Sequence, residues 1–168
     1  MSFYAHPFYF NHKIMNETEL FFKAIQQGNA DHVKAQLERN PELVNAKDAR
    51  GFTPLIFASY FDKEDLVKVL IEGKAPVDGT DALGNTALIG VSFKGNTDLA
   101  SYLIAHGANI NAKNNNGVTP LIFASMYNQS KMVELLLKYG ADVSLIDKDG
   151  KMALDYAEEK VLKVLLNF

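Results

Sequence analysis

The chain has 168 residues, 48% of them hydrophobic, with a net charge of -3 and no cysteine. This apolar fraction predicts a folded domain with a continuous core. The lack of cysteine excludes a disulfide framework, a thiol nucleophile and a thiolate metal site. The charge argues against nucleic acid as a partner, because nucleic-acid-binding proteins usually carry a basic patch. No apolar run approaches the roughly 20 residues that span a bilayer, so we expect no membrane partner.

Residues 1–16 form an aromatic N-terminal extension outside any repeating pattern. Its aromatic side chains are Phe3, Tyr4, Phe8, Tyr9 and Phe10. Two interpretations stay open: an arm that packs into a groove of this protein or of a neighbour, or an extension without fixed structure. The segment lacks the cationic start and the long apolar centre of a secretory signal, so we expect a cytoplasmic protein.

One nine-residue phrase organises the rest of the chain. Gly-Phe-Thr-Pro-Leu-Ile-Phe-Ala-Ser at 51–59 returns as Gly-Val-Thr-Pro-Leu-Ile-Phe-Ala-Ser at 117–125, and weaker versions begin at Gly84 and Gly150. The first residues of these four phrases are 33 positions apart, and such a fixed period predicts a repeat array.

Each phrase predicts a tight turn followed by a short helix. Thr53 and Thr119 are good N-cap residues, and Pro54 and Pro120 suit the first helical position, where no N–H is needed. A second apolar stripe with helical spacing follows in each full unit. We therefore expect a pair of helices in every full unit.

Four glycines set expectations about the ends and the interior of these helices. Gly107 and Gly140 can cap the second helix of their units, whereas Lys74 stands at the equivalent position in an earlier unit and Gly73 comes one place before it. We expect that cap to be remodelled. Gly90 falls inside a helix, which costs about 0.5 to 1 kcal/mol relative to alanine. It either permits close packing or reflects sequence drift.

An acidic or amide residue precedes each phrase, three positions before its glycine. These residues are Asp48, Asp81, Asn114 and Asp147. With them, the units resemble ankyrin repeats, whose pattern joins Asp-x-x-Gly-x-Thr-Pro-Leu, a helix pair and a Gly-Ala-Asp/Asn-x-Asn ending. The resemblance implies an all-α repeat solenoid of ankyrin-type helix-turn-helix units joined by β-hairpin-like turns. It also suggests a small stand-alone array of bacterial style.

The resemblance covers residues 17–168 as a single domain. Its expected parts are an N-terminal capping unit at 17–47, full units at 48–80, 81–113 and 114–146, and a truncated C-terminal capping unit at 147–168. In the first unit we expect Leu20, Phe21, Ala24 and Ile25 on the first helix. The family's histidine after Thr-Pro-Leu ties neighbouring units by hydrogen bonds. Here that position holds isoleucine, so we expect apolar stacking to replace those bonds.

The resemblance also implies a binding surface, a concave face lined by the hairpin tips and the exposed ends of the first helices. The matching tip residues are Arg50, Phe52, Leu83, Asn85, Asn115, Asn116 and Val118. The matching helix-end residues are Tyr60, Phe61, Phe93, Lys94, Met126 and Tyr127. Aromatic and methionine side chains at solvent-facing positions favour a contact surface. The alternative is that some of these aromatic and methionine side chains pack in the core, where we also expect Phe57 and Phe123.

Chemistry beyond binding finds little support in the sequence. No two of the four histidines, His6, His12, His32 and His106, have the spacing of a helical zinc pair. No nucleophile elbow or phosphate-binding glycine loop occurs. We expect no catalytic residue, metal or cofactor. The sequence favours a monomeric, non-enzymatic adaptor that binds another protein. The alternative is an accessory or an immunity- or inhibitor-type protein that stabilises or blocks an enzyme.

Overall fold

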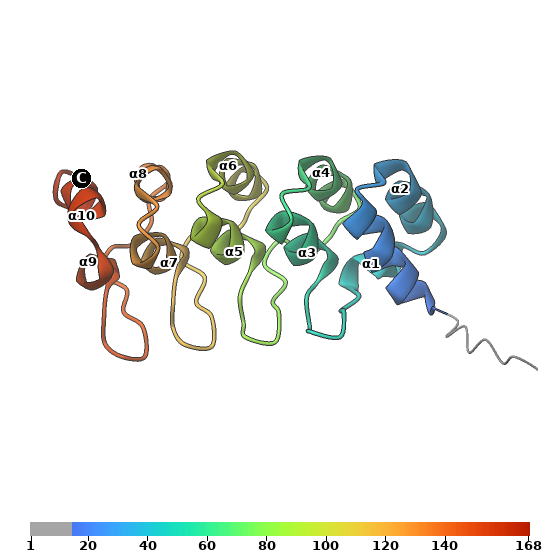
Figure 1. Cartoon of the computed structure of the whole chain (residues 1–168), viewed down its shortest axis with the longest axis horizontal. Coiled ribbons are helices and arrows are strands. Elements are labelled where there is room, and N and C mark those ends of the chain that lie inside the picture. Colours follow the sequence, from blue (N-terminus) through green and yellow to red (C-terminus); the bar gives the residue numbers. More distant parts are fainter. Residues whose placement is uncertain (1–14) are drawn as a thin grey trace, which may run out of the picture.

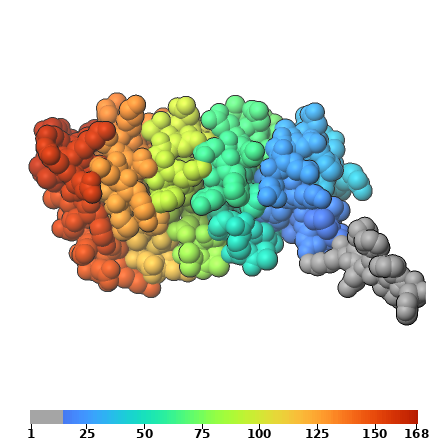
Figure 2. All heavy atoms as spheres, in the orientation of Figure 1, coloured from blue at the N-terminus to red at the C-terminus, as the bar shows by residue number. Residues whose placement is uncertain are grey.

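The computed structural model describes residues 15–168, so the aromatic extension expected at 1–16 lies outside the described residues as far as residue 14. The described residues form helices and loops without a strand, arranged as two parallel rows of helices (Figure 1). Successive units pack side by side in chain order (Figure 2). The expected all-α repeat solenoid is confirmed.

The first row of helices carries the loops, and the second row covers its other side (Figure 1). The first row contains α1 (Glu17–Gln27), α3 (Pro54–Tyr60), α5 (Ala87–Lys94), α7 (Pro120–Met126) and α9 (Ala153–Tyr156). The second row contains α2 (Ala30–Arg39), α4 (Glu64–Glu72), α6 (Thr97–Ala105), α8 (Ser130–Lys138) and α10 (Glu159–Leu166). A short 3-10 helix, η1 (Pro41–Asn45), follows α2. Between residues 15 and 168, no helix combines the length and apolarity of a membrane crossing.

Each of the loops that precede α3, α5, α7 and α9 is closed by the side chain of its own first residue. Asp48 Oδ1 accepts the backbone N–H groups of Arg50 and Phe52, both at 2.9 Å. The same pair of bonds forms at Asp81, Asn114 and Asp147. Aspartate and asparagine are short enough to bond their own backbone in this way, which explains their presence at each loop start.

The first-row helices begin where the sequence predicts. Thr53 and Thr119 cap α3 and α7, each side-chain oxygen accepting the N–H three residues on at 3.2 Å. Pro54 and Pro120 are the first residues of those helices. Thr86 caps α5 in the same way, although no proline follows it.

The core lies between the two rows and runs through all units. Ile56, Ile89 and Ile122, at the position of the family's histidine, are 5%, 1% and 1% exposed. Apolar side chains therefore fill this position, as expected. In the first unit Leu20 is 44% exposed and Phe22 is buried. The four residues expected on the first helix, Leu20, Phe21, Ala24 and Ile25, all lie in α1, so that expectation is confirmed.

The second-row helices α4, α6 and α8 end in one shared geometry. Lys74 has a φ of 70°, close to the values of 91° at Gly107 and 85° at Gly140. At all three positions the N–H bonds the carbonyl three residues back, and the next N–H bonds the carbonyl five residues back. The expectation of a remodelled cap is wrong, because Lys74 itself adopts the left-handed backbone.

We predict that Lys74→Gly stabilises the protein by about 1 kcal/mol, because a side chain in the left-handed region is strained by roughly that amount. Urea unfolding followed by circular dichroism measures the change. Gly107→Lys is the matched reverse variant and should lose a similar amount, since an added Cβ at Gly107 meets no atom within 4 Å. An unchanged or lower unfolding midpoint in Lys74→Gly would contradict this explanation.

Candidate protein-binding surface

The loop tips and the first-row helices together form one surface with three hollows, which we call the groove surface. The first hollow, of about 880 Å³, lies among α1, the first loop and α3. The middle hollow, of about 180 Å³, lies among α3, the second loop, α5 and α7. The last hollow, of about 310 Å³, lies between the third and fourth loops beside α7 and α9.

Most of the helix-end residues expected to bind a partner reach solvent on this surface. Tyr60, Phe61, Met126 and Tyr127 are 42%, 41%, 37% and 48% exposed. Phe93, from the unit between them, is half-buried. Large apolar side chains at the ends of α3 and α7 are therefore available for contact.

Aromatic rings from three elements form a first aromatic group beside the first hollow. Its members are Phe22, Phe52, Phe57, Tyr60 and Phe61. Adjacent ring centroids lie 4.8 to 6.2 Å apart, within the range in which aromatic rings attract one another. Phe57 is buried, as expected, and it anchors the exposed ring of Phe61 at 4.8 Å.

Phe93, Phe123 and Tyr127 form a second aromatic group. The Phe93 centroid lies 6.2 Å from Phe123 and 4.4 Å from Tyr127. Phe123, which we expect in the core, packs against it but is only half-buried, and it also lines the middle hollow. The reason is the open space beside α5, where the preceding unit has Gly90 and no side chain to cover the ring.

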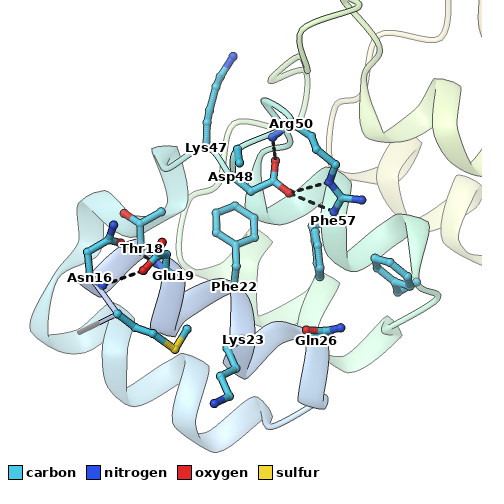
Figure 3. Close-up of a pocket in the computed structure, with 13 residues that line it drawn as sticks. Asn16, Thr18, Glu19, Phe22, Lys23, Gln26, Lys47, Asp48, Arg50 and Phe57 are labelled. Carbon is cyan, nitrogen blue, oxygen red and sulfur yellow. Dashed lines mark hydrogen bonds and ion pairs between the residues drawn. The ribbon is translucent and has the colours of Figure 1, made fainter. Parts of the chain in front are cut away.

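The first hollow joins an apolar wall to a charged rim (Figure 3). The rings of Phe22 and Phe57 stand below the loop that carries Asp48 and Arg50 (Figure 3). The Arg50 guanidinium donates to Asp48 Oδ2 at 3.1 and 3.2 Å. Its carbon also lies 4.6 Å from the centroid of Phe52. Arg50 is therefore exposed yet held in place by two neighbours.

Lys94, which we expect to contact a partner, also links two units of the array. Its ammonium donates to the Tyr60 carbonyl at 2.6 Å and forms an ion pair with Asp62. Asn96 donates to the other oxygen of Asp62 at 2.9 Å. Burial alone would raise the pKa of Asp62, but the bonds from Lys94 and Asn96 outweigh it and lower that pKa. This tie fixes the end of α3 relative to α5.

Equivalent ties hold the next units. Gln129 donates to the Phe93 carbonyl at 3.0 Å, one unit further along than the bond from Lys94. Asn128 donates to Glu158 at 3.0 Å. The helix ends on the groove surface are thus joined by polar bonds in addition to the apolar core.

Some of the expected tip residues are exposed, and others are partly or fully buried by contacts within the array. Leu83, Asn115 and Asn116 are exposed, whereas Phe52 and Asn85 are half-buried. Asn85 donates to Asp81 at 3.1 Å and accepts from Asn114 at 2.9 Å, so it links two loops. Val118 is 7% exposed and packs into the core. We correct its expected role and leave it out of the proposed contact surface, since its short side chain is covered.

One hydrogen-bonded pair on this surface was not predicted from the sequence. The Tyr156 hydroxyl donates to Asp147 Oδ2 at 2.6 Å. That hydrogen bond raises the pKa of Tyr156 to about 12 and lowers the pKa of Asp147. The position of Tyr156 in the repeat could have predicted that it lies on this surface, because Tyr156 stands six residues after its turn glycine, as Phe57 and Phe123 do. Among residues 15–168, no cluster of three or more histidine and acidic side chains could hold a metal ion.

The fold and this surface define a helical repeat array that presents loop tips and aromatic helix ends along one side. The family model for ankyrin repeats, in three copies, matches residues 20–114, 63–147 and 90–167. The chain therefore belongs to the ankyrin-repeat family. Ankyrin repeats indicate a protein–protein interaction module, and the family is typically non-catalytic.

One curated relative shares a short stretch of the chain. Over 46 residues the chain is 48% identical to the human (Homo sapiens) DNA-binding protein RFXANK. The stretch makes up 27% of this chain and 18% of that protein. The match thus spans less than a fifth of the relative's length.

We predict that stability falls as the pH rises from about 10 to about 12, the ordinary and the folded pKa of Tyr156. The pKa of Tyr156 is higher in the folded than in the unfolded protein. Its hydrogen bond therefore adds fully to the free energy of unfolding below the unfolded-state pKa, and this contribution is lost as the pH rises through the folded-state pKa. Tyr156→Phe keeps the ring and should remove this part of the alkaline loss, measured as melting temperature against pH. Tyr139→Phe, at an exposed tyrosine, should retain it. Identical alkaline profiles for wild type and Tyr156→Phe would contradict the assignment.

Proposed function

We propose that this chain binds another protein through the groove surface, with the exposed rings of the two aromatic groups as its main contacts. The observation that carries the proposal is the exposure of Tyr60, Phe61, Met126 and Tyr127 on one side of the array. Exposed apolar patches of this kind usually mark interaction sites. Tyrosine is also among the residues most enriched at interface hot spots.

The groove surface is suited to binding because it is already ordered. Phe61 packs on Phe57, and Tyr127 packs on Phe93 with centroids 4.4 Å apart. Lys94 fixes the end of α3 through the Tyr60 carbonyl. Side chains held in place lose little freedom on association, so more of the contact energy contributes to affinity.

A protein is a better partner for this surface than a nucleic acid. Two cations of the groove surface, Arg50 and Lys94, are already paired with Asp48 and Asp62. Paired cations release few counterions from a phosphate backbone, and the chain's net charge is -3. The human relative's name describes a DNA-binding protein, but the match covers a small part of it. We therefore do not extend DNA binding to this chain.

A narrower version of the proposal is an accessory or inhibitor that stabilises or blocks an enzyme. We also propose that the array is monomeric and acts in the cytoplasm. Size-exclusion chromatography with light scattering tests the first of these, and fractionation of the source cells tests the second. An enzyme that co-purifies and changes its rate when the array is added would support the narrower version.

We predict that replacing Tyr60 and Tyr127 together by alanine removes the partner. Loss of a hot-spot tyrosine costs about 2 kcal/mol, roughly thirtyfold in affinity. The measurement is an affinity pull-down from a lysate of the source organism, with retained proteins identified by mass spectrometry. Proteins that bind wild type specifically should be lost from the double variant.

Tyr139→Ala provides the matched control. Tyr139 is 49% exposed, against 48% for Tyr127, but it ends a second-row helix, away from the groove surface. This variant should retain the same proteins as wild type. A folded Tyr60/Tyr127 double variant with an unchanged set of retained proteins would overturn the proposed surface.

A further inference from the structure

One position of the repeat differs between the middle unit and the others. Six residues after their turn glycines, the units carry Phe57, Gly90, Phe123 and Tyr156. Three units place an aromatic ring there, and the middle unit places none. A Cβ built on Gly90 would meet no heavy atom within 4 Å, so the space of the missing ring stays open. The close-packing interpretation of Gly90 is therefore wrong.

The middle hollow lies at this position. Gly90 lines it together with Phe52 and Tyr60 of the preceding unit and Phe93 and Phe123 on the other side. The lining is almost wholly apolar, and the hollow has a volume of about 180 Å³. A cavity of roughly 150 Å³ is known to hold one benzene molecule. The size and chemistry of the hollow thus match a single aromatic ring.

The rings around the hollow also leave room for one more. Phe52 and Tyr60 belong to the first aromatic group, and Phe93 and Phe123 belong to the second. Among residues 15–168, no ring of one group pairs with a ring of the other. A ring placed in the hollow would therefore lie between the two groups, and aromatic rings at such separations attract one another.

A carboxylate at the hollow admits a phenol as well as a phenyl ring. Asp81 lines the hollow and stands nine residues before Gly90, as Asp147 stands nine residues before Tyr156. Asp147 Oδ2 accepts the Tyr156 hydroxyl. The corresponding oxygen of Asp81 accepts from Asn85 at 3.1 Å, and a carboxylate oxygen has a second lone pair for a further donor.

We propose that the middle hollow is a subsite that receives one phenylalanine or tyrosine side chain from an extended segment of a partner protein. The inference rests on the proposed function and names the chemistry of its partner. The hollow is smaller than the roughly 300 to 1,000 Å³ of small-molecule sites, so it suits a single side chain. It opens beside exposed Tyr60 and Leu83, where the rest of the segment finds further contacts.

The test fills the hollow from inside with Gly90→Phe, which installs the ring that two other units already carry. Full-length protein with labelled isoleucine methyl groups is titrated with N-acetyl-phenylalanine amide, N-acetyl-tyrosine amide and N-acetyl-leucine amide. In wild type, an aromatic probe should shift the methyl signals of Ile56 and Ile89, both of which line the hollow, and the shifts should saturate. Binding should be at least tenfold weaker in Gly90→Phe and for the leucine probe.

Gly90→Ala is the matched control, because it removes the helix-interior glycine and leaves most of the hollow empty. It should keep the aromatic binding, and urea unfolding should show that both variants are folded. Wild type without saturable shifts at Ile56 and Ile89, or equal binding by Gly90→Phe, would overturn the subsite. Binding that appears only after Phe8, Tyr9 and Phe10 are replaced by alanine would assign the hollow to the chain's own segment and overturn the partner assignment.

A selection of displayed random peptides separates this inference from the proposed function. The subsite predicts selected peptides that share one aromatic position and lose affinity at least tenfold on Gly90→Phe. Peptides that need Tyr60 and Tyr127 but show no aromatic position and bind Gly90→Phe equally would overturn the subsite alone. Aromatic probes that bind the hollow, together with a pull-down insensitive to the Tyr60/Tyr127 variant, would overturn the proposed surface and with it the assignment of the ring to a partner protein.

Discussion

A helix pair of this size has no core of its own, so each unit is buried only by the units beside it. The three full units therefore present the same apolar side chain at the same place, as Ile56, Ile89 and Ile122 do. The loops obey the same register, because Asp48 and its equivalents close each one with the same two bonds. A residue's position within the 33-residue period thus fixes its place in space, and tips and helix ends gather on one side.

Polar bonds between helix ends link the units in addition to the apolar stacking at the isoleucine positions. Lys94 and Gln129 each reach a carbonyl at the end of the preceding first-row helix. These bonds cross from one unit to the next beside the exposed rings, and they set where Tyr60 and Phe93 lie. A long polar side chain on the groove surface can therefore also stabilise the array itself, as Lys94 does through Tyr60 and Asp62.

The sequence predicts those features that depend on local interactions. Thr53 caps a helix three residues away, and Asp48 closes a loop within five residues, so both follow from the phrase alone. Val118 was misplaced because its burial depends on the neighbouring elements that cover it. The cap at Lys74 was misjudged for another reason. The hydrogen bonds and packing of the neighbouring turn hold the lysine in a backbone region that its side chain disfavours.

Gly90 shows how one departure from a repeat creates a feature that no single unit possesses. A glycine at this point costs helix stability, and no close contact in the array requires it. Its effect is to interrupt a row of rings, leaving two rigid aromatic groups with an apolar hollow between them. Exposed rings on both sides offer area to many partners, whereas a hollow the size of one ring distinguishes among side chains. Affinity and selectivity on this surface thus come from different residues, and the register of the repeat sets them side by side.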